Sequence, residues 1–299
     1  MQSFLTPDPI VVEVRNAAGT VTIDLTDTTT TTVDVVQLSS NGLNFIDDLM
    51  SSFRRDTSRT ENATDVLDDV RVDLRVQENG TVLIVDADPA RSGWRASFGV
   101  HITAPAGSGI RTQTQSADVR VTGSADRLDI RTAAGDVQAD RVERGSLVQS
   151  ASGDVRISEI GGDAEIRSVS GDVTVQRCAG AISVHSTSGD VRIEQPEQDV
   201  FVRSVSGDIN LRDAVTGSIQ ATAVSGDIEI GIHAGSAAKL DLSTVAGDTR
   251  NDFELSDEPL APSSQDTPVD DADVKRGGRL EITCRTTSGD IRLRRAVAA

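Results

Sequence analysis

Apolar and polar residues alternate with a period of two through most of the chain after residue 106. In a strand with one buried face every second side chain points into the core, so this alternation predicts strands and not helices. The first and third residues after a repeated Asp are apolar, as at Val173 and Val175. A second apolar pair, such as Ile182 and Val184, lies eight and six residues before the next Asp. The pattern predicts two rows of short strands whose apolar sides face each other.

The motif Ser-x-Ser-Gly-Asp punctuates these strands at nearly fixed spacing. The motif is complete at four of nine aligned Asp residues and partial at the others. The first six are spaced 18 residues apart and the last three at longer intervals: Asp118, Asp136, Asp154, Asp172, Asp190, Asp208, Asp227, Asp248 and Asp290. A fixed period of this kind indicates a solenoid. Eighteen residues at ~3.3 Å each suffice for two short strands and two corners. We therefore predict an all-β, single-stranded parallel β-solenoid, with the last repeat closing the rod after an insertion.

The Gly-Asp pair has a structural interpretation at these corners. Glycine permits the positive φ of a tight turn, and Asp or Ser side chains accept hydrogen bonds from nearby backbone N–H groups. Stacked carboxylates could instead bind calcium, as in the β-roll nonapeptide G-G-x-G-x-D-x-U-x. That signature fails, because every Asp except Asp118 directly follows Gly, and every Asp except Asp248 directly precedes Val or Ile. The nine Asp are expected to be structural corners, and no metal site is predicted.

Two outward columns of the predicted solenoid carry arginine on alternate coils. The second residue after Asp and the fifth residue before it contribute Arg120, Arg156, Arg192, Arg131, Arg167 and Arg203. Adjacent like charges ~5 Å apart would repel, which explains why arginine skips a coil. These six residues form the candidate interaction face.

The chain before and after the regular repeats has a different composition. Residues 1–105 read as a β-rich cap over the first coil, with a helical or loop insertion at about 41–69. Residues 106–299 form the predicted solenoid, which is interrupted at about 251–278 by an acidic, Pro- and Ser-rich loop. Thr249 and Asn251 occupy inward positions just before this loop, so one coil ends irregularly there.

Charge and cysteine content restrict the class of protein. The formal net charge is −18, which argues against nucleic acid and anionic membranes as partners. No secretory leader and no apolar stretch long enough to span a membrane is visible, so a cytoplasmic location without membrane insertion is expected. Cys178 and Cys284 lie several coils apart, so they are expected to be buried and unpaired.

Catalytic chemistry finds little support in the sequence. The three histidines, His101, His185 and His233, have no catalytic or metal-ligand spacing. A polysaccharide-cleaving β-helix would need one special pair of carboxylates and aromatic platforms, whereas the carboxylates here recur in nearly every coil. No enzyme activity and no cofactor are predicted, and a polysaccharide-active enzyme is the lower-ranked alternative.

The repeated S-x-S-G-D-[VI]-x-[VIL] between Asp118 and Leu293 resembles the bacterial β-strand-repeat family labelled "putative adhesin", also called the toastrack domain. The resemblance implies a β-solenoid without catalytic residues, and some relatives are tied to envelope-stress systems. The leading hypothesis is a non-catalytic scaffold or protein-interaction module, which the resemblance links to an envelope-stress or regulatory system through a membrane-protein partner. A cell-surface adhesin is the alternative, and end-to-end stacking into homo-oligomers stays open wherever a terminal coil is poorly capped.

Overall fold

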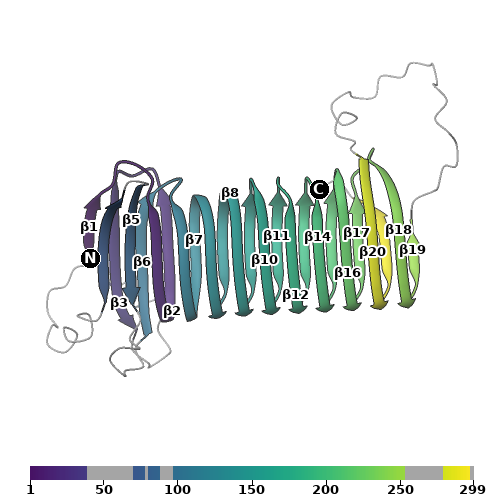
Figure 1. Cartoon of the computed structure of the whole chain (residues 1–299), viewed down its shortest axis with the longest axis horizontal. Coiled ribbons are helices and arrows are strands. Elements are labelled where there is room, and N and C mark those ends of the chain that lie inside the picture. The colour runs from purple at the N-terminus through teal and green to yellow at the C-terminus, as the bar shows by residue number, and fades with distance from the viewer. Residues whose placement is uncertain (39–69, 78–79, 88–96, 253–278, 297–299) are drawn as a thin grey trace, which may run out of the picture. The chain divides into compact units, whose positions relative to one another are not determined.

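The computed structural model describes residues 1–38, 70–77, 80–87, 97–252 and 279–296, and these residues form strands joined by turns (Figure 1). The predicted insertion at 41–69 lies outside the described residues, as does the acidic loop from residue 253 onward. The chain divides into two compact units, Met1–Asp140 and Arg141–Ala299. The boundary predicted at residues 105 and 106 falls inside the first unit, between two strands.

Unit 1 is built around one long strand. Its strands are β1 (Gln2–Leu5), β2 (Val11–Thr26), β3 (Thr30–Leu38), β4 (Arg71–Gln77), β5 (Gly80–Ala87), β6 (Ser97–Pro105) and β7 (Gly109–Ala134), followed by the start of β8 (Val137–Ser152). On one edge β2 runs parallel to β5 and then to β6, and on its other edge it runs parallel to β7. Strands β1, β3 and β4 are added by antiparallel pairing.

A glycine near the middle of β2 allows this strand to contribute to two faces. Gly19 has a φ of 119°, and a Cβ there would lie 2.2 Å from the Phe98 carbonyl oxygen. The side chains of Val12, Val21 and Phe98 are each at most 1% exposed. The apolar alternation on either side of Gly19 therefore gives two buried rows within a single strand.

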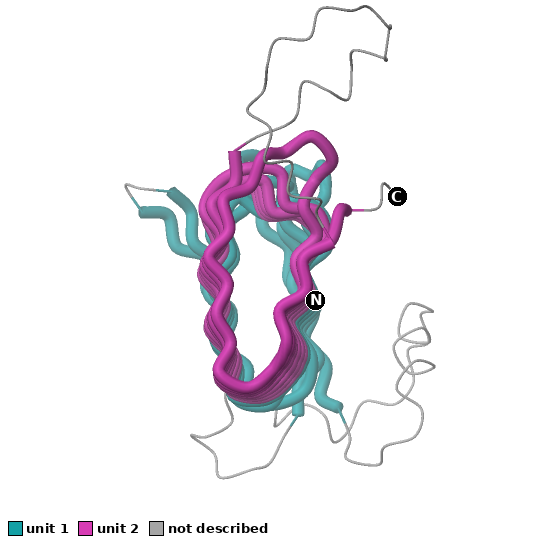
Figure 2. The backbone as a smooth tube through the Cα atoms, turned by 90° about the vertical axis from the view of Figure 1, so that its right-hand side faces the viewer, with its two compact units in different colours: residues 1–140 teal, residues 141–299 magenta. Residues whose placement is uncertain are grey.

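Unit 2 consists of two facing columns of parallel strands. The first column contains the end of β8, β10 (Asp163–Ser170), β12 (Ile182–Ser188), β14 (Val200–Ser206), β16 (Gly217–Ser225), β20 (Arg279–Ser288) and β18 (Ala237–Ala246). The second contains β9 (Val155–Ile160), β11 (Val173–Cys178), β13 (Val191–Pro196), β15 (Ile209–Ala214), β17 (Ile228–Ile232), β21 (Ile291–Arg295) and β19 (Thr249–Asn251). Figure 2 shows the unit 2 coils superimposed as one flattened ring.

The core of unit 2 is the narrow space between these columns. Val173, Val175, Ile182 and Val184 are at most 2% exposed, and the equivalent residues of the neighbouring coils are buried in the same way. Register is constant from coil to coil, as in Ile166 beside Val184. The prediction of an all-β parallel solenoid with two strands per coil is confirmed.

The order of the last two coils differs from the order of the sequence. Strand β16 pairs with β20, and β20 in turn pairs with β18, so β20 lies between them (Figure 1). In the same way β21 lies between β17 and β19. The expectation that the final repeat closes the rod is therefore wrong. The coil formed by β18 and β19 ends unit 2, because its poorly apolar inward residues, Thr249 and Asn251, suit an end position.

Candidate functional site

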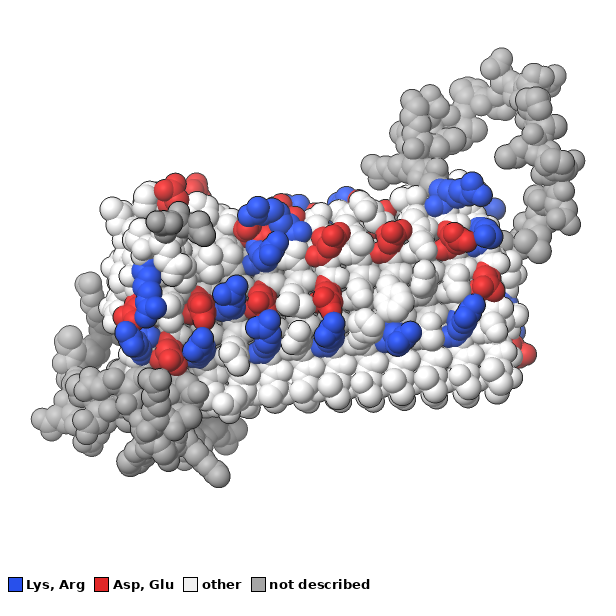
Figure 3. Space-filling view, viewed as in Figure 1, with Lys and Arg blue, Asp and Glu red and all other residues white. Residues whose placement is uncertain are grey.

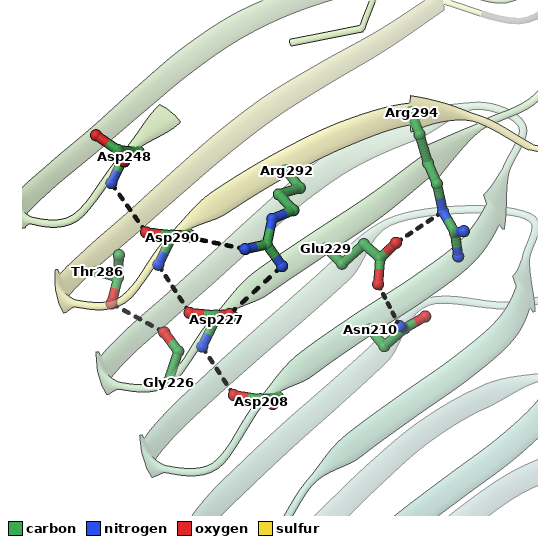
Figure 4. A network of polar contacts seen from close by, with 10 residues as sticks. All are labelled: Asp208, Asn210, Gly226, Asp227, Glu229, Asp248, Thr286, Asp290, Arg292 and Arg294. Atoms are coloured by element: carbon green, nitrogen blue, oxygen red, sulfur yellow. Dashed lines mark hydrogen bonds and ion pairs between the residues drawn. The ribbon is translucent and has the colours of Figure 1, made fainter. Parts of the chain in front are cut away.

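The repeated Asp residues form a continuous hydrogen-bonded column along the corners of unit 2. Oδ1 of each carboxylate accepts a hydrogen bond from the backbone N–H of the Asp in the adjoining coil. The N···Oδ1 distances are 2.8 to 2.9 Å along Asp154, Asp172, Asp190, Asp208, Asp227, Asp290 and Asp248. Figure 4 shows the last four of these residues in a row. In unit 1, Asp136 donates in the same way to Asp118 at 2.9 Å.

The neighbouring N–H groups donate in the opposite direction along the column. Gly171 N–H donates to the Ser188 carbonyl at 3.2 Å, and Val173 N–H donates to the Asp190 carbonyl at 2.9 Å. Gly171 has a φ of 119°, and a Cβ there would lie 2.3 Å from the Gly153 carbonyl oxygen. Glycine is therefore required by the close stacking of the corners, and the Asp carboxylate replaces a backbone carbonyl as the acceptor for the next Asp N–H.

A second set of corners uses the same contact less regularly, and sequence reasoning missed it. Asp163 Oδ1 accepts from Ala181 N–H at 3.0 Å, and Asp199 Oδ1 accepts from Ser218 N–H at 2.8 Å. These Asp residues occur on alternate coils, so they do not produce an obvious motif. Their signal in the sequence is an Asp directly before the first inward apolar residue of the strand, as in Asp163-Ala164.

The corner carboxylates also pair with nearby arginines, of which Arg156 belongs to the candidate interaction face. Asp154 pairs with Arg156 at 2.7 Å, and Arg292 lies between Asp290 at 2.8 Å and Asp227 at 3.6 Å (Figure 4). The hydrogen bond from Asp248 N–H, helped by Arg292, lowers the pKa of Asp290. Among the described residues there is no group of three or more His, Cys, Asp or Glu able to hold a metal ion.

Three of the six predicted arginines, Arg131, Arg156 and Arg167, pair with a carboxylate of their own coil. In unit 1, Arg120 donates to Gln138 at 2.7 Å and Arg131 lies 3.5 Å from Asp129. In unit 2, Arg167 pairs with Glu165. Arg192 makes no ion pair with a described residue. Figure 3 shows the resulting rows of blue and red side chains on one face.

Arg203 differs from the other arginines of its column. Its guanidinium carbon lies 5.8 Å from the centroid of the Phe201 ring, in a cation–π contact. The same ring lies 5.4 Å from the ring of His185, at an interplanar angle of 53°. Phe201 occupies the outward position that Glu165 occupies two coils earlier. An aromatic ring has therefore replaced the carboxylate that neutralises Arg167.

A shallow groove of about 330 Å³ adjoins this ring. Strands β12, β14 and β16 supply its floor through Ser183, Phe201 and Gln220, and the corner residues Asp163 and Asp199 line one end. We call the surface formed by Ser183, His185, Phe201, Arg203 and Gln220 the Phe201 face. The sequence places His185 and Arg203 in one column but gives no reason to single out Phe201, because its importance depends on the neighbouring coils.

The two cysteines are buried and unpaired, as predicted. Burial raises the pKa of Cys178 to about 11 and that of Cys284 to about 12. Cys178 Sγ lies 3.4 Å from the Gly180 carbonyl oxygen. Both groups stay thiols at neutral pH, so neither is a nucleophile.

Stacked parallel coils with aspartate corners define a β-solenoid repeat protein. The chain belongs to the Toastrack DUF4097 family, whose pattern it matches over residues 12–211 and 179–294. No curated protein matches the chain. No helix in the described part is long and apolar enough to cross a membrane.

Three crystal structures are similar over nearly their whole length. A "putative adhesin" from Bacteroides fragilis is 14% identical, with a TM-score of 0.43, and the match covers 98% of this chain and 95% of that one. A "putative cell adhesion protein" from Clostridium sporogenes is 9% identical, with a TM-score of 0.23 and 98% of each chain covered. A "putative adhesin" from Parabacteroides merdae is 9% identical, with a TM-score of 0.27 and coverage of 98% and 94%.

Proposed function

We propose that this protein is a non-catalytic β-solenoid scaffold that binds a protein partner through its Phe201 face. A non-catalytic role is favoured because the acidic residues recur in the same structural contact from coil to coil. Catalysis by carboxylates would need one pair with a distinct environment. The alternatives are a cell-surface adhesin and, ranked lower, a polysaccharide-active enzyme. The experiments below distinguish them from the scaffold.

One observation carries the choice of the Phe201 face. Arg167 and Arg285 in the same column pair with carboxylates, whereas Arg203 has no acidic partner among the described residues and lies over Phe201. Arginine and aromatic residues are enriched among residues that contribute most to protein binding. An exposed cation on an aromatic ring, beside a groove, fits a partner segment that offers a carboxylate and an apolar side chain.

The finer identity of this partner rests on the family resemblance. Relatives tied to envelope-stress systems make a membrane protein of such a system the first candidate. Unit 2 would then present the binding residues from stacked strands at a fixed spacing.

The test is an affinity pull-down from membrane and cytosolic fractions of the native host, followed by identification of the bound proteins. The Phe201→Ala, Arg203→Ala double variant should lose the specific partner. The matched control is Glu165→Ala, Arg167→Ala, which changes the equivalent positions two coils away and should retain it. Equal recovery by all three proteins would contradict the proposal. The alternatives are tested in separate assays. Binding to intact cells without a recovered protein partner would favour the adhesin, and binding or cleavage of polysaccharide would favour the enzyme.

A further inference from the structure

The coil formed by β18 and β19 leaves one side of its strands open. β18 pairs with β20 and β19 with β21, and neither is paired with a second described strand. Leu240 and Leu242 are half-buried, whereas Ile282 and Cys284, their equivalents in the adjoining coil, are 0% exposed. Val245, at the corner of the end coil, is 81% exposed. The end coil therefore presents both unpaired backbone and partly exposed apolar side chains.

The direction of the backbone groups along this edge follows from the interior coils. Ile182 N–H donates to the carbonyl of Asp199, toward the following coil. Register carries this position through Val200, Ile219 and Ile282 to Leu240. A residue of a strand points its N–H and C=O to the same side, and the side alternates along the chain. Leu240, with Ala238 and Leu242, therefore directs both backbone groups away from β20.

The sequence of β18 is complementary to itself in one antiparallel register. If Leu240 lies opposite Leu240 of a second copy, these two residues form a hydrogen-bonded pair, which matches the direction of their backbone groups. Lys239 then lies opposite Asp241 of the second copy, and the reverse pair forms by symmetry. These are neighbours of the closer, non-hydrogen-bonded type, in which side chains interact directly.

The charges around this edge favour the same arrangement. Lys239 Nζ lies 2.8 Å from Glu281 of β20, and Arg285 lies 3.7 Å from Asp241. In two copies joined at Leu240, Glu281 and Lys239 of one copy would lie next to Asp241 and Arg285 of the other. The four charges then alternate in sign along a row. A two-fold axis is the commonest symmetry of homo-oligomers, and it requires a patch that is complementary to itself.

We propose that a second copy of this chain binds the open edge, by antiparallel pairing of β18 with β18 about a two-fold axis at Leu240. The contact area is limited to the cross-section of one coil, so the dimer should be weak and dependent on concentration. This proposal is independent of the Phe201 face, which lies on the outer surface of other coils.

Analytical ultracentrifugation over a range of concentrations tests the dimer. Asp241→Lys replaces both opposite-charge pairs by like charges and should raise the dissociation constant about tenfold or more. The combination Lys239→Asp, Asp241→Lys restores opposite charges and should recover dimerisation. Glu165→Lys is the matched control, because Glu165 is an arginine-paired acid at the same position five coils inside, and it should leave the dimer unchanged. Thermal melts establish that each variant is folded.

Disulfide formation tests the register. Leu240→Cys places two thiols opposite each other on the axis and should give a covalent dimer on oxidation. Leu242→Cys lies opposite Ala238 of the second copy and should not. The wild-type protein remaining monomeric at every concentration, or equal cross-linking of the two cysteine variants, would overturn the proposal.

Discussion

At the Asp corners of unit 2, one carboxylate oxygen provides the hydrogen-bond acceptor that links each coil to the next. The Asp carboxylate accepts the N–H of the next Asp at 2.8 to 2.9 Å in every described step of unit 2. The contact requires an acceptor at Oδ1 but not a negative charge. Replacing the carboxylate by an amide should therefore preserve the corner, whereas removing the oxygen should leave a backbone donor without its partner.

Asp172 provides the test at the scale of one residue. Asp172→Asn keeps an acceptor for Asp190 N–H and should change the free energy of unfolding little. Asp172→Ala removes it and should cost about 1 to 3 kcal/mol. Urea unfolding of the two variants beside the wild type measures the difference. Equal losses would mean that charge, and not hydrogen bonding, holds the corner.

Much of this residue scale could be predicted from the sequence. Buried positions such as Val173 follow from the alternation, and Gly-Asp at a fixed period indicates a corner that glycine must turn. The Phe201 face could not be predicted in the same way. Phe201 contacts His185, 16 residues earlier, only because the coils stack. No local pattern marks an outward phenylalanine as different from any other exposed apolar residue.

At the scale of elements, the main surprise is the placement of β20 and β21 inside the solenoid. Residues 237–251 and 279–295 both carry the repeat, so sequence order predicts that the first of these coils adjoins β16 and β17. Packing favours the other order, because Leu280, Ile282 and Ile291 fill an interior coil that Thr249 and Asn251 would fill poorly. The sequence shows that the inward residues Thr249 and Asn251 are irregular. It does not show that they mark the end of the stack.

Engineered disulfides can test this order. Glu229 lies beside Arg292 in register, and Arg250 lies on the far side of Arg292. The pair Glu229→Cys, Arg292→Cys should therefore cross-link readily on oxidation. The pair Glu229→Cys, Arg250→Cys spans two coils, roughly 10 Å, which a disulfide cannot bridge. Mass spectrometry of peptides after oxidation distinguishes them, and a 229–250 cross-link alone would show that the coils follow sequence order.

For the whole molecule, the cysteines set how stability changes at alkaline pH. The chain has two cysteines, no tyrosine and only two lysines, so few other groups titrate there. In the folded protein the pKa values of Cys178 and Cys284 are about 11 and about 12, above the value of 9.0 for an unburied thiol. Above pH 9 the unfolded chain releases these protons while the folded chain keeps them, so rising pH favours unfolding.

The free energy of unfolding should therefore fall between about pH 9 and pH 11, by about 1.4 kcal/mol per pH unit for each cysteine. Urea unfolding at pH 8, 9 and 10 measures this slope. A Cys178→Ala, Cys284→Ala variant should have a lower stability at pH 8 but a much flatter dependence on pH. An unchanged slope in that variant would assign the alkaline loss to other groups.

The nested position of β20 and β21 also separates the order of synthesis from the order of assembly. A ribosome releases residues 237–251 before it has made the strands against which they pack in the finished protein. Until residues 279–295 exist, the edge of β16 and β17 has no native partner, and the nascent β18 is the nearest strand able to occupy it. Residues 237–251 can therefore reach their native position only after residues 279–295 have paired with β16 and β17.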